Sequence, residues 1–391
     1  MKKDHLRIAM IGHKRIPSRE GGVEVVVGEL GARLCGLGHR VVCYNRRSGK
    51  GGATPPAHWR GMELRSAITI GRRGIAAVTS SVAAAVCAAF GPYDVVHFHA
   101  EGPSAMLWLP RLMGKRCICT VHGLDHRREK WKSGLGGWYM RLGERVAVRF
   151  ADEIIVLSRH MQAYFLERYG RRTVYIPNGV NPPVRRKPRL IRSRFGLDAG
   201  SYILYLGRIE PGKGVDDLID AYCGLQTDKR LVIAGDGADC PGYVRMLRER
   251  AAQNERIVFT GFAEGEMLDE LYTNAYVFVL PSYSEGMPLS LLEALSCGSC
   301  CVTSDIPEFA EVVGRYGVTF ARGIVDALRA ALQTLCDEPE TVQAYRACTA
   351  AYARARFSWE QMTRRTLALY TQEECAPEDR EIEETERPFV A

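Results

Sequence analysis

Several features that would place the chain in a familiar class are missing from its 391 residues. Residues 1–7 run directly into an expected strand, without the apolar segment of a secretory signal. No apolar run is a convincing membrane-spanning helix: the nearest, residues 74–90, is short, weakly apolar and interrupted by Thr79, Ser80 and Ser81, which favours a packed helix. These absences predict a cytoplasmic protein whose 13 scattered cysteines are reduced and mostly buried.

Motifs for metal and dinucleotide binding are also missing. Cys297, Cys300 and Cys301 form a cluster, but no second Cys or His pair at zinc-ligand spacing accompanies them, so we expect small buried side chains. No Asp-x-Asp pair stands at the end of an expected strand. The gap from Gly12 to Gly21 is too long for the dinucleotide-binding glycine motif. The sequence therefore predicts no metal site and no cofactor.

Acidic residues are scarce in the first half of the chain. Residues 1–180 hold 29 Lys and Arg against 13 Asp and Glu, a net charge of +16; the rest hold 24 against 32, a net charge of −8, which together give +8. A basic half can serve nucleic acid, an anionic membrane surface or a phosphorylated substrate, or form a merely soluble basic face. No RNA-binding or zinc-finger signature accompanies the charge, so we expect no nucleic-acid partner.

Strand-like and helix-like segments alternate along the whole chain, which predicts an α/β fold with parallel sheets and crossover helices. The expected strands of the first half are Leu6–Ile11, Arg40–Tyr44, Val95–His99, Arg116–Val121, Glu153–Leu157 and Val174–Ile176. Those of the second half are Tyr202–Leu206, Arg230–Ala234, Ile257–Thr260, Tyr276–Leu280 and Cys300–Val302. The sequence thus predicts two Rossmann-like domains in tandem.

The domain boundary is expected at residues 181–198, which carry several prolines and arginines without a helical or strand period. This linker separates an N-terminal domain, residues 1–180, from a C-terminal domain, residues 199–356. The helix of residues 357–372 has no strand after it and is expected to cross back to the N-terminal domain, and residues 373–391 form an acidic tail. Because ligands bind at the carboxyl ends of parallel strands, we expect an active site in a cleft between two facing domains.

Two carboxylates, Glu285 and Glu293, stand eight positions apart just after the strand that ends at Leu280. Glu285 is expected on the strand-to-helix loop and Glu293 about one and a half turns into a helix that opens with Pro288. Free backbone N–H groups at a helix start attract phosphate, and carboxylates accept hydrogen bonds from hydroxyls. The segment therefore fits a sugar nucleotide, although two solvated glutamates flanking a helix would look the same.

A second loop, from Gly207 to Gly214, follows another strand and carries two cations, Arg208 and Lys213. Fixed cations on a glycine-rich loop suit a diphosphate and would neutralise the charge that grows on a diphosphate leaving group. A turn with solvated cations is the alternative.

Three weaker signals also follow strands. Gly235-Asp236-Gly237, with Phe262 after the next strand, would lie near a base and ribose, although an ordinary turn has the same sequence. Gly21-Gly22 would allow a ligand to approach the start of the first helix, or form an ordinary loop. His122 could bind sugar hydroxyls or assist proton transfer, or be a structural histidine. We expect His97 and His99 to pack behind such a site.

At these residues the chain resembles glycosyltransferase family 4, the large retaining group with the GT-B fold. The resemblance rests on four segments: Ser284–Ala294, which matches the family's Glu-x7-Glu motif, Gly207–Gly214, Ile176–Val180 and Gly21-Gly22. They span most of the chain in the family's order.

The resemblance implies a role for each matched residue. Glu293 would bind the donor ribose, Glu285 the transferred sugar, and Arg208 with Lys213 the diphosphate, while His122 would contact sugar at the reaction centre. The residues thereby expected to be catalytic are Glu285, His122, Arg208 and Lys213. Those expected to bind the donor are Gly21, Gly22, Arg208, Lys213, Asp236, Gly237, Phe262, Glu285, Gly286, Met287, Leu289 and Glu293.

A narrower likeness, at residues 16–24 and 121–131, is to bacterial capsule and O-antigen glycosyltransferases, some of which transfer rhamnose. The chain departs from their usual pattern at Arg15, Glu20 and Val23, in the acceptor-facing loop, which leaves the sugar and the acceptor open. The resemblance places the acceptor against four residues: Arg15, Arg19, Glu20 and Asp125.

The sequence and the resemblance together predict a retaining, metal-independent glycosyltransferase of bacterial cell-surface polysaccharide biosynthesis. Its substrate would be a UDP-, GDP- or dTDP-sugar, and its acceptor a saccharide linked to lipid at the inner leaflet. The basic N-terminal half would then dock on anionic lipid at the inner face of the cell membrane. A sugar-nucleotide epimerase of the same fold and a non-catalytic sugar-nucleotide or polyanion binding protein are the alternatives.

Overall fold

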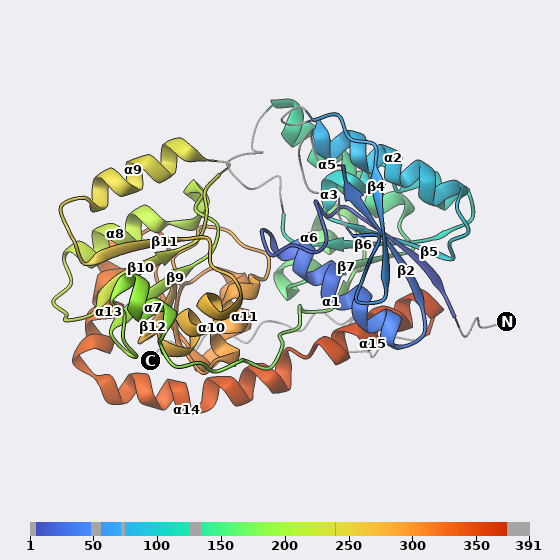
Figure 1. Cartoon of the computed structure of the whole chain (residues 1–391). Coiled ribbons are helices and arrows are strands. Elements are labelled where there is room, and N and C mark those ends of the chain that lie inside the picture. Colours follow the sequence, from blue (N-terminus) through green and yellow to red (C-terminus); the bar gives the residue numbers. More distant parts are fainter. Residues whose placement is uncertain (1–4, 48–55, 72–74, 125–133, 239, 374–391) are drawn as a thin grey trace. The chain divides into compact units, whose positions relative to one another are not determined.

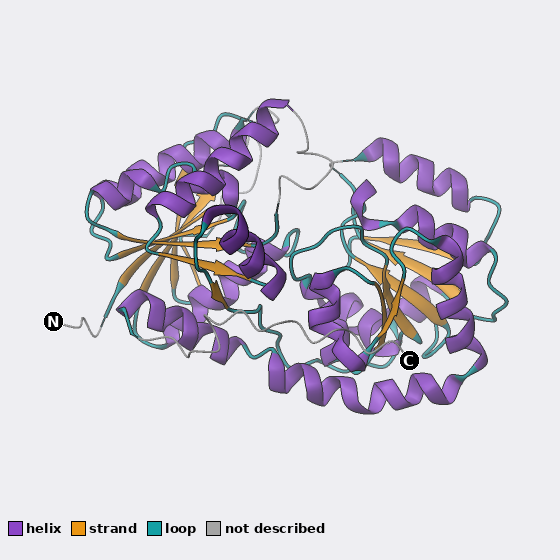
Figure 2. Cartoon of the chain, turned by 180° about the vertical axis from the view of Figure 1, so that it is seen from behind, coloured by secondary structure: helices purple, strands orange, loops and turns teal. Residues whose placement is uncertain are grey.

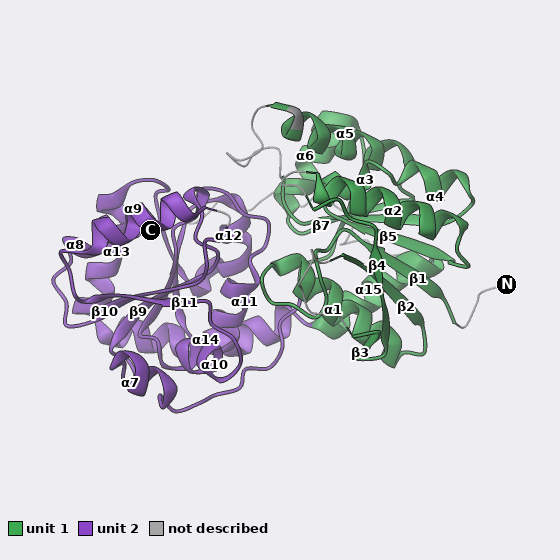
Figure 3. Cartoon of the chain, turned by 45° about the horizontal axis from the view of Figure 1, so that its top comes forward, with its two compact units in different colours: residues 1–178, 359–391 green, residues 179–358 purple. Residues whose placement is uncertain are grey.

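The chain folds into two compact units, each built around one parallel sheet (Figures 1 and 3). The computed structural model describes residues 5–47, 56–71, 75–124, 134–238 and 240–373. Unit 1 comprises Met1–Asn178 and Trp359–Ala391, and unit 2 comprises Gly179–Ser358. Helices lie on both sides of each sheet (Figure 2).

The sheet of unit 1 has the strand order β3-β4-β2-β1-β5-β6-β7-β8, and only β3 runs antiparallel to its neighbour. Its strands are β1 (Arg7–Ile11), β2 (Arg40–Arg46), β3 (His58–Trp59), β4 (Met62–Ala67), β5 (Val95–His99), β6 (Arg116–Val121), β7 (Glu153–Val156) and β8 (Val174–Tyr175). Every residue of β5 is buried, as expected of a central parallel strand covered on both faces. The direction of chain progression reverses between β1 and β5, which makes their carboxyl ends a topological switch point.

The helices of unit 1 come from both ends of the chain. They are α1 (Gly22–Gly36), α2 (Ala76–Phe90), α3 (Glu101–Ser104), α4 (Trp108–Leu112), α5 (Gly134–Phe150), α6 (Arg159–Tyr169) and α15 (Trp359–Thr371). On α2 the residues Ala84, Ala85 and Ala88 face the apolar core beside Phe98 of β5. This helix therefore packs on the sheet. No helix in the described part of the chain is both long and apolar enough to span a lipid bilayer.

Unit 2 has a six-stranded parallel sheet with the order β11-β10-β9-β12-β13-β14. Its strands are β9 (Tyr202–Leu206), β10 (Arg230–Ala234), β11 (Ile257–Gly261), β12 (Val277–Leu280), β13 (Cys300–Ser304) and β14 (Val318–Phe320). Its helices are α7 (Leu190–Phe195), α8 (Val215–Cys223), α9 (Pro241–Ala251), α10 (Gly265–Asn274), α11 (Leu289–Ser296), α12 (Pro307–Val313), α13 (Val325–Asp337) and α14 (Pro339–Arg356), with 3₁₀ turns η3 (Pro211–Lys213) and η4 (Gly314–Tyr316). The switch point of this sheet lies between β9 and β12.

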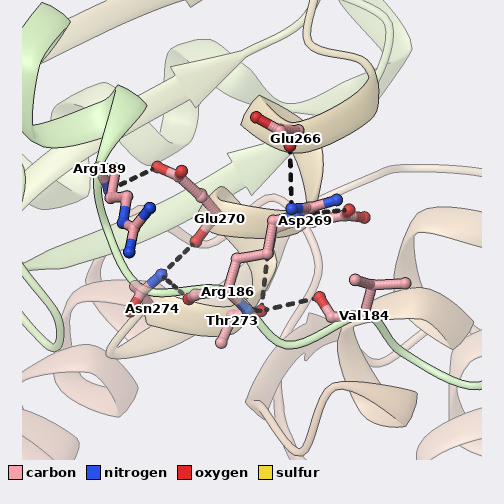
Figure 4. A network of polar contacts seen from close by, with 8 residues as sticks. All are labelled: Val184, Arg186, Arg189, Glu266, Asp269, Glu270, Thr273 and Asn274. Carbon is pink, nitrogen blue, oxygen red and sulfur yellow. Dashed lines mark hydrogen bonds and ion pairs between the residues drawn. The ribbon is translucent and has the colours of Figure 1, made fainter.

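The predicted linker, residues 181–198, differs from the structure because it is part of unit 2 and contains α7. The carboxylate of Glu270, on α10, accepts hydrogen bonds from the backbone N–H groups of Arg189 (2.9 Å) and Ile191 (3.0 Å) and so caps the start of α7. Arg186, just upstream, pairs with Asp269 of the same helix (Figure 4). Tertiary contacts with α10 therefore order a segment that has no periodicity of its own.

Candidate active site

Lys213 and Glu285 meet at the switch point of unit 2. Lys213 ends η3 after β9, and Glu285 lies on the loop between β12 and α11. Lys213 Nζ donates to Glu285 Oε1 at 2.5 Å, and the buried hydroxyl of Ser282 donates to the same oxygen at 2.9 Å. Both charged residues are only 9% exposed. The structure thus brings together two of the predicted site residues as a buried ion pair.

Glycines allow the loops at this sheet edge to pack closely. Gly214 has φ +64°, and a Cβ there would lie 2.3 Å from the carbonyl oxygen of Pro281, which precedes Ser282. Gly235 has φ +151°, and a Cβ there would lie 1.8 Å from the carbonyl oxygen of Gly207. Only glycine fits such contacts at positive φ. The glycines of the two motifs therefore hold the loops after β9, β10 and β12 against one another.

Arg208 differs from Lys213 in its exposure. Its side chain is 47% exposed and pairs with Glu210 at 3.2 Å, while its carbonyl oxygen accepts a hydrogen bond from Tyr205 Oη at 2.8 Å. An exposed ion pair contributes little energy, so the guanidinium can change partners when an anion arrives.

Glu293 lies on α11, half-buried, and accepts a hydrogen bond from Tyr272 Oη at 3.0 Å. The prediction that Pro288 is the first helical residue is off by one: Pro288 is the N-cap with extended backbone, and the helix begins at Leu289. Proline has no side chain that could cap the helix, and Gly286 and Met287 just before it are buried.

The remaining donor candidates of unit 2 follow β10 and β11. Asp236 is exposed, and its carbonyl oxygen accepts a hydrogen bond from the backbone N–H of Ile209 at 2.9 Å. Gly237 is buried, where a Cβ would lie 2.3 Å from Val244. Phe262 is 42% exposed, which is unusual for a phenylalanine and leaves its ring available for stacking.

In unit 1, His122 follows β6 and is half-buried. Its Nε2 lies 3.1 Å from Nδ1 of His99, whose ring is stacked on it. His97 is bound on both sides, by Tyr370 Oη of α15 at 2.6 Å and by Thr120 Oγ1 at 2.7 Å. His99 thus contacts His122 directly, and His97 packs on His99; both are fully buried.

Burial shifts the titration of these histidines. Loss of hydration lowers the pKa of His97 to about 3, with a smaller contribution from His122, and lowers the pKa of His99 well below its ordinary value. Sequence reasoning missed a related residue, His13, on the loop after β1. Its Nε2 lies 3.0 Å from Asn45 Oδ1, and burial lowers its pKa to about 4. The signal available was its position directly after a central strand.

Ion pairs stabilise the loop that contains Arg15 and Glu20, which was expected to face the acceptor. Glu20 pairs with Lys14 at 2.8 Å and with Arg15 at 3.4 Å, and Arg19 beside it is exposed. The loop ends at Gly21, which is the N-cap of α1, and Gly22, which is exposed, opens the helix. Asp125 lies outside the described residues.

The described residues contain no group of three or more His, Cys, Asp or Glu side chains placed to bind a metal ion. Cys300 and Cys301 are buried, and Cys297 is half-buried. Loss of hydration, followed by the charge of Glu293, raises the pKa of the Cys297 thiol to about 12.

Two family models match the chain one after the other. "Glycosyltransferase Family 4" matches residues 20–183, and "Glycosyl transferases group 1" matches residues 200–338. The chain belongs to glycosyltransferase family 4. It is an α/β glycosyltransferase of the GT-B type, as the sequence predicted.

Relatives of this glycosyltransferase act in different branches of carbohydrate chemistry. It is 28% identical to the α-maltose-1-phosphate synthase of Mycolicibacterium smegmatis, over 93% of this chain and 99% of the relative. It is 34% identical to the O-antigen chain mannosyltransferase B of Escherichia coli, over 50% of this chain and 51% of the relative.

Solved structures share the fold. The sucrose-phosphate synthase of Thermosynechococcus elongatus has a TM-score of 0.78 at 22% identity, covering 94% of this chain and 98% of that one. Anabaena HepE, solved with UDP and glucose, has a TM-score of 0.77 at 18% identity, covering 94% of this chain and 100% of that one.

Proposed function

We propose that this glycosyltransferase moves a sugar from a nucleoside-diphosphate sugar to a saccharide acceptor, with retention of configuration and without a metal ion. The observation that carries the proposal is the buried Lys213–Glu285 pair at the switch point of unit 2, where open α/β sheets bind their ligands. A second support is Anabaena HepE, a protein of the same fold that was solved with UDP and glucose.

The charges around the pair suit a diphosphate leaving group. Lys213 and Arg208 would neutralise the negative charge that grows on the leaving phosphate, which is the task a metal ion performs in other enzymes. Glu285 would accept hydrogen bonds from hydroxyls of the transferred sugar, and Glu293 from those of the ribose. With the acceptor on the same face as the leaving group, a phosphate oxygen would take its proton and configuration would be retained.

Substituting the site tests this assignment. Lys213→Ala and Glu293→Ala should each lower kcat/KM roughly 100-fold or more, as expected when electrostatic transition-state stabilisation is lost. Lys187→Ala and Glu255→Ala remove exposed charges of the same unit and should leave kcat/KM unchanged. Transfer that survives both site substitutions would overturn the assignment.

Assays with and without acceptor separate the reaction types. A glycosyltransferase releases nucleotide stoichiometrically with transfer, whereas an epimerase converts the donor without an acceptor. The donor itself can be found by thermal shift with UDP-, GDP- and dTDP-sugars, because a ligand that binds the folded state raises Tm.

We further infer a lipid-linked acceptor of cell-surface polysaccharide assembly, at an anionic membrane surface. Residues 1–180 carry a net charge of +16. On α2, Val82, Val86 and Phe90 are exposed at intervals of four residues, and the neighbouring α4 exposes Leu112. Exposed apolar side chains in a unit with a net positive charge suit a membrane interface. The O-antigen chain mannosyltransferase of Escherichia coli points to the same kind of pathway.

Liposome co-sedimentation at low salt tests the membrane part of the proposal. Binding should be strong with anionic lipid and weak with neutral lipid, and Val86→Glu/Phe90→Glu should reduce it. Equal binding to neutral liposomes would contradict the electrostatic argument.

A further inference from the structure

Unit 2 contains a cavity of about 130 Å³ that is remote in sequence from the loops after β9 and β10. Its walls are Arg185 from the segment that enters the unit, Thr273 of α10, Cys297 and Gly298 after α11, and Arg346 of α14. The lining thus holds two guanidinium groups, one hydroxyl and one thiol, and no carboxylate.

The network on α10 sets the direction of Arg185. Arg186 faces α10, where Nε lies 3.0 Å from Asp269 and Nη1 lies 3.0 Å from Glu266, and its backbone carbonyl accepts from Asn274 (Figure 4). Thr273 Oγ1 reaches the carbonyl of Val184 in the same network. With its neighbours on both sides fixed to α10, Arg185 lines the cavity instead. Within the described part of the chain its guanidinium has no hydrogen bond or ion pair.

Arg346, on α14, supplies the second cation of the lining. Its Nη1 donates to the backbone carbonyls of Ala275 at 2.7 Å and Tyr276 at 3.5 Å, so the guanidinium is held in place without a carboxylate partner. Burial lowers the pKa of Arg346, and the charge of Arg185 lowers it further. Both arginines line the same cavity.

The carboxylates nearest to the cavity already have other partners. Asp269 is engaged by Arg186, and Glu293 accepts from Tyr272. The Cys297 thiol stays protonated because its pKa is about 12. Gly298, at φ +80°, has a backbone conformation that favours glycine, and a Cβ there would be in contact with Arg185 Nη2 at 3.5 Å.

We propose that this cavity binds a phosphate group, either as free orthophosphate or on a small phosphorylated molecule. Guanidinium groups bind phosphate oxygens with paired, charge-assisted hydrogen bonds, and a dianion would neutralise both arginines at once. The volume of about 130 Å³ is roughly ten times the 10–15 Å³ that one water molecule needs, which leaves room for an anion larger than water. The ligand would tie the segment that enters unit 2 to α14, the helix that leads out of it.

Calorimetric titration with potassium phosphate, at constant ionic strength, tests the site on the full chain. Arg185→Ala should weaken binding about 10-fold or more, as the loss of a charge-assisted contact implies. Arg346→Lys keeps the positive charge but loses the planar guanidinium that makes paired hydrogen bonds, and should also weaken binding. Lys187→Ala removes an exposed cation two residues away and should leave the affinity unchanged.

The variant Lys213→Ala distinguishes this cavity from the donor site. It changes the donor site and should retain phosphate binding at the cavity. Parallel titrations with glucose 6-phosphate and with glucose identify the source: tighter binding of the hexose phosphate than of orthophosphate supports a phosphorylated metabolite, and the reverse order supports free phosphate. Equal phosphate affinity of the wild type and Arg185→Ala, or loss of binding in Lys213→Ala alone, would overturn the proposal. Neither outcome bears on sugar transfer at the donor site.

Discussion

At the scale of single residues, the buried histidines of unit 1 predict how its stability depends on pH. Burial lowers the pKa of His13 from 6.5 to about 4 and that of His97 to about 3. Below pH 6.5 these histidines become protonated in the unfolded chain but stay neutral in the folded chain. Stability is therefore complete above pH 6.5 and falls as the pH drops toward 4, by about 1.4 kcal/mol per pH unit for each such histidine. Urea unfolding at pH 7, 6 and 5 measures this slope.

The variant His13→Gln isolates the contribution of one histidine to this pH dependence of stability. It removes one buried imidazole and should make the decline of the unfolding free energy with falling pH shallower. His58→Gln changes an exposed histidine of β3 and should leave the slope as in the wild type. If His13→Gln and the wild type decline in parallel, His13 does not carry the effect.

The burial of the Lys213–Glu285 pair leads to a second prediction at this scale, which concerns stability and not catalysis. Removing one partner of a buried pair leaves a desolvated charge, which costs about 3 kcal/mol. Lys213→Ala should therefore destabilise unit 2 more than the double variant Lys213→Ala/Glu285→Ala does. Chemical denaturation without ligand gives both values, and a double variant that is less stable than either single one would contradict the prediction.

At the scale of elements, the close contact of loops after β9 and β10 depends on Gly235. A methyl group there would overlap the carbonyl of Gly207, and the backbone has positive φ. Gly235→Ala should separate the two loops and weaken donor binding roughly 10-fold or more, since a carbonyl cannot yield as a flexible side chain can. Gly242→Ala, on α9, meets no atom within 4 Å and is the matched control. Calorimetry with the donor nucleotide compares the two variants.

The elements that sequence patterns predicted are those with long apolar runs. The strands β5, β6, β9 and β10 have the predicted bounds, because both faces of a central parallel strand are buried and the run is continuous. The pair β3 and β4 was missed: β3, at the edge of the sheet, has only two residues, and β4 beside it has three of its six residues outside the core and a charged face. The helix α7 was missed because its start is capped by Glu270, which lies 79 residues away from Ile191 in sequence.

The residues of the candidate site likewise fall into those that the sequence predicted and those that it did not. Glycines, cations and carboxylates after strands could be predicted, because parallel strands bring their carboxyl ends to one edge of a sheet. The partners of those residues could not. Ser282 on Glu285, Tyr272 on Glu293 and His99 on His122 are fixed by packing between elements, and nothing in their local sequence marks them.

At the scale of the whole molecule, the chain crosses between its units twice, and unit 1 depends on its C-terminal segment. The helix α15 packs on α1, where Arg33 pairs with Glu360 at 3.2 Å and lies over the ring of Trp359. At its other end Tyr370 binds His97 of β5. Unit 1 therefore cannot complete its core until the whole of unit 2 has been synthesised.

Trp359→Ala tests this dependence. The indole is 2% exposed, and deleting a buried tryptophan costs about 3–5 kcal/mol through lost burial and a cavity. The loss should fall on unit 1: hydrogen exchange should accelerate in β1, β5 and α1, while unit 2 exchanges as before and its affinity for nucleotide stays unchanged. Trp138→Ala, which removes a 56% exposed indole from α5 of the same unit, should have little effect. Equal acceleration of exchange in both units would mean that they unfold as one, and that α15 stabilises the molecule as a whole and not unit 1 alone.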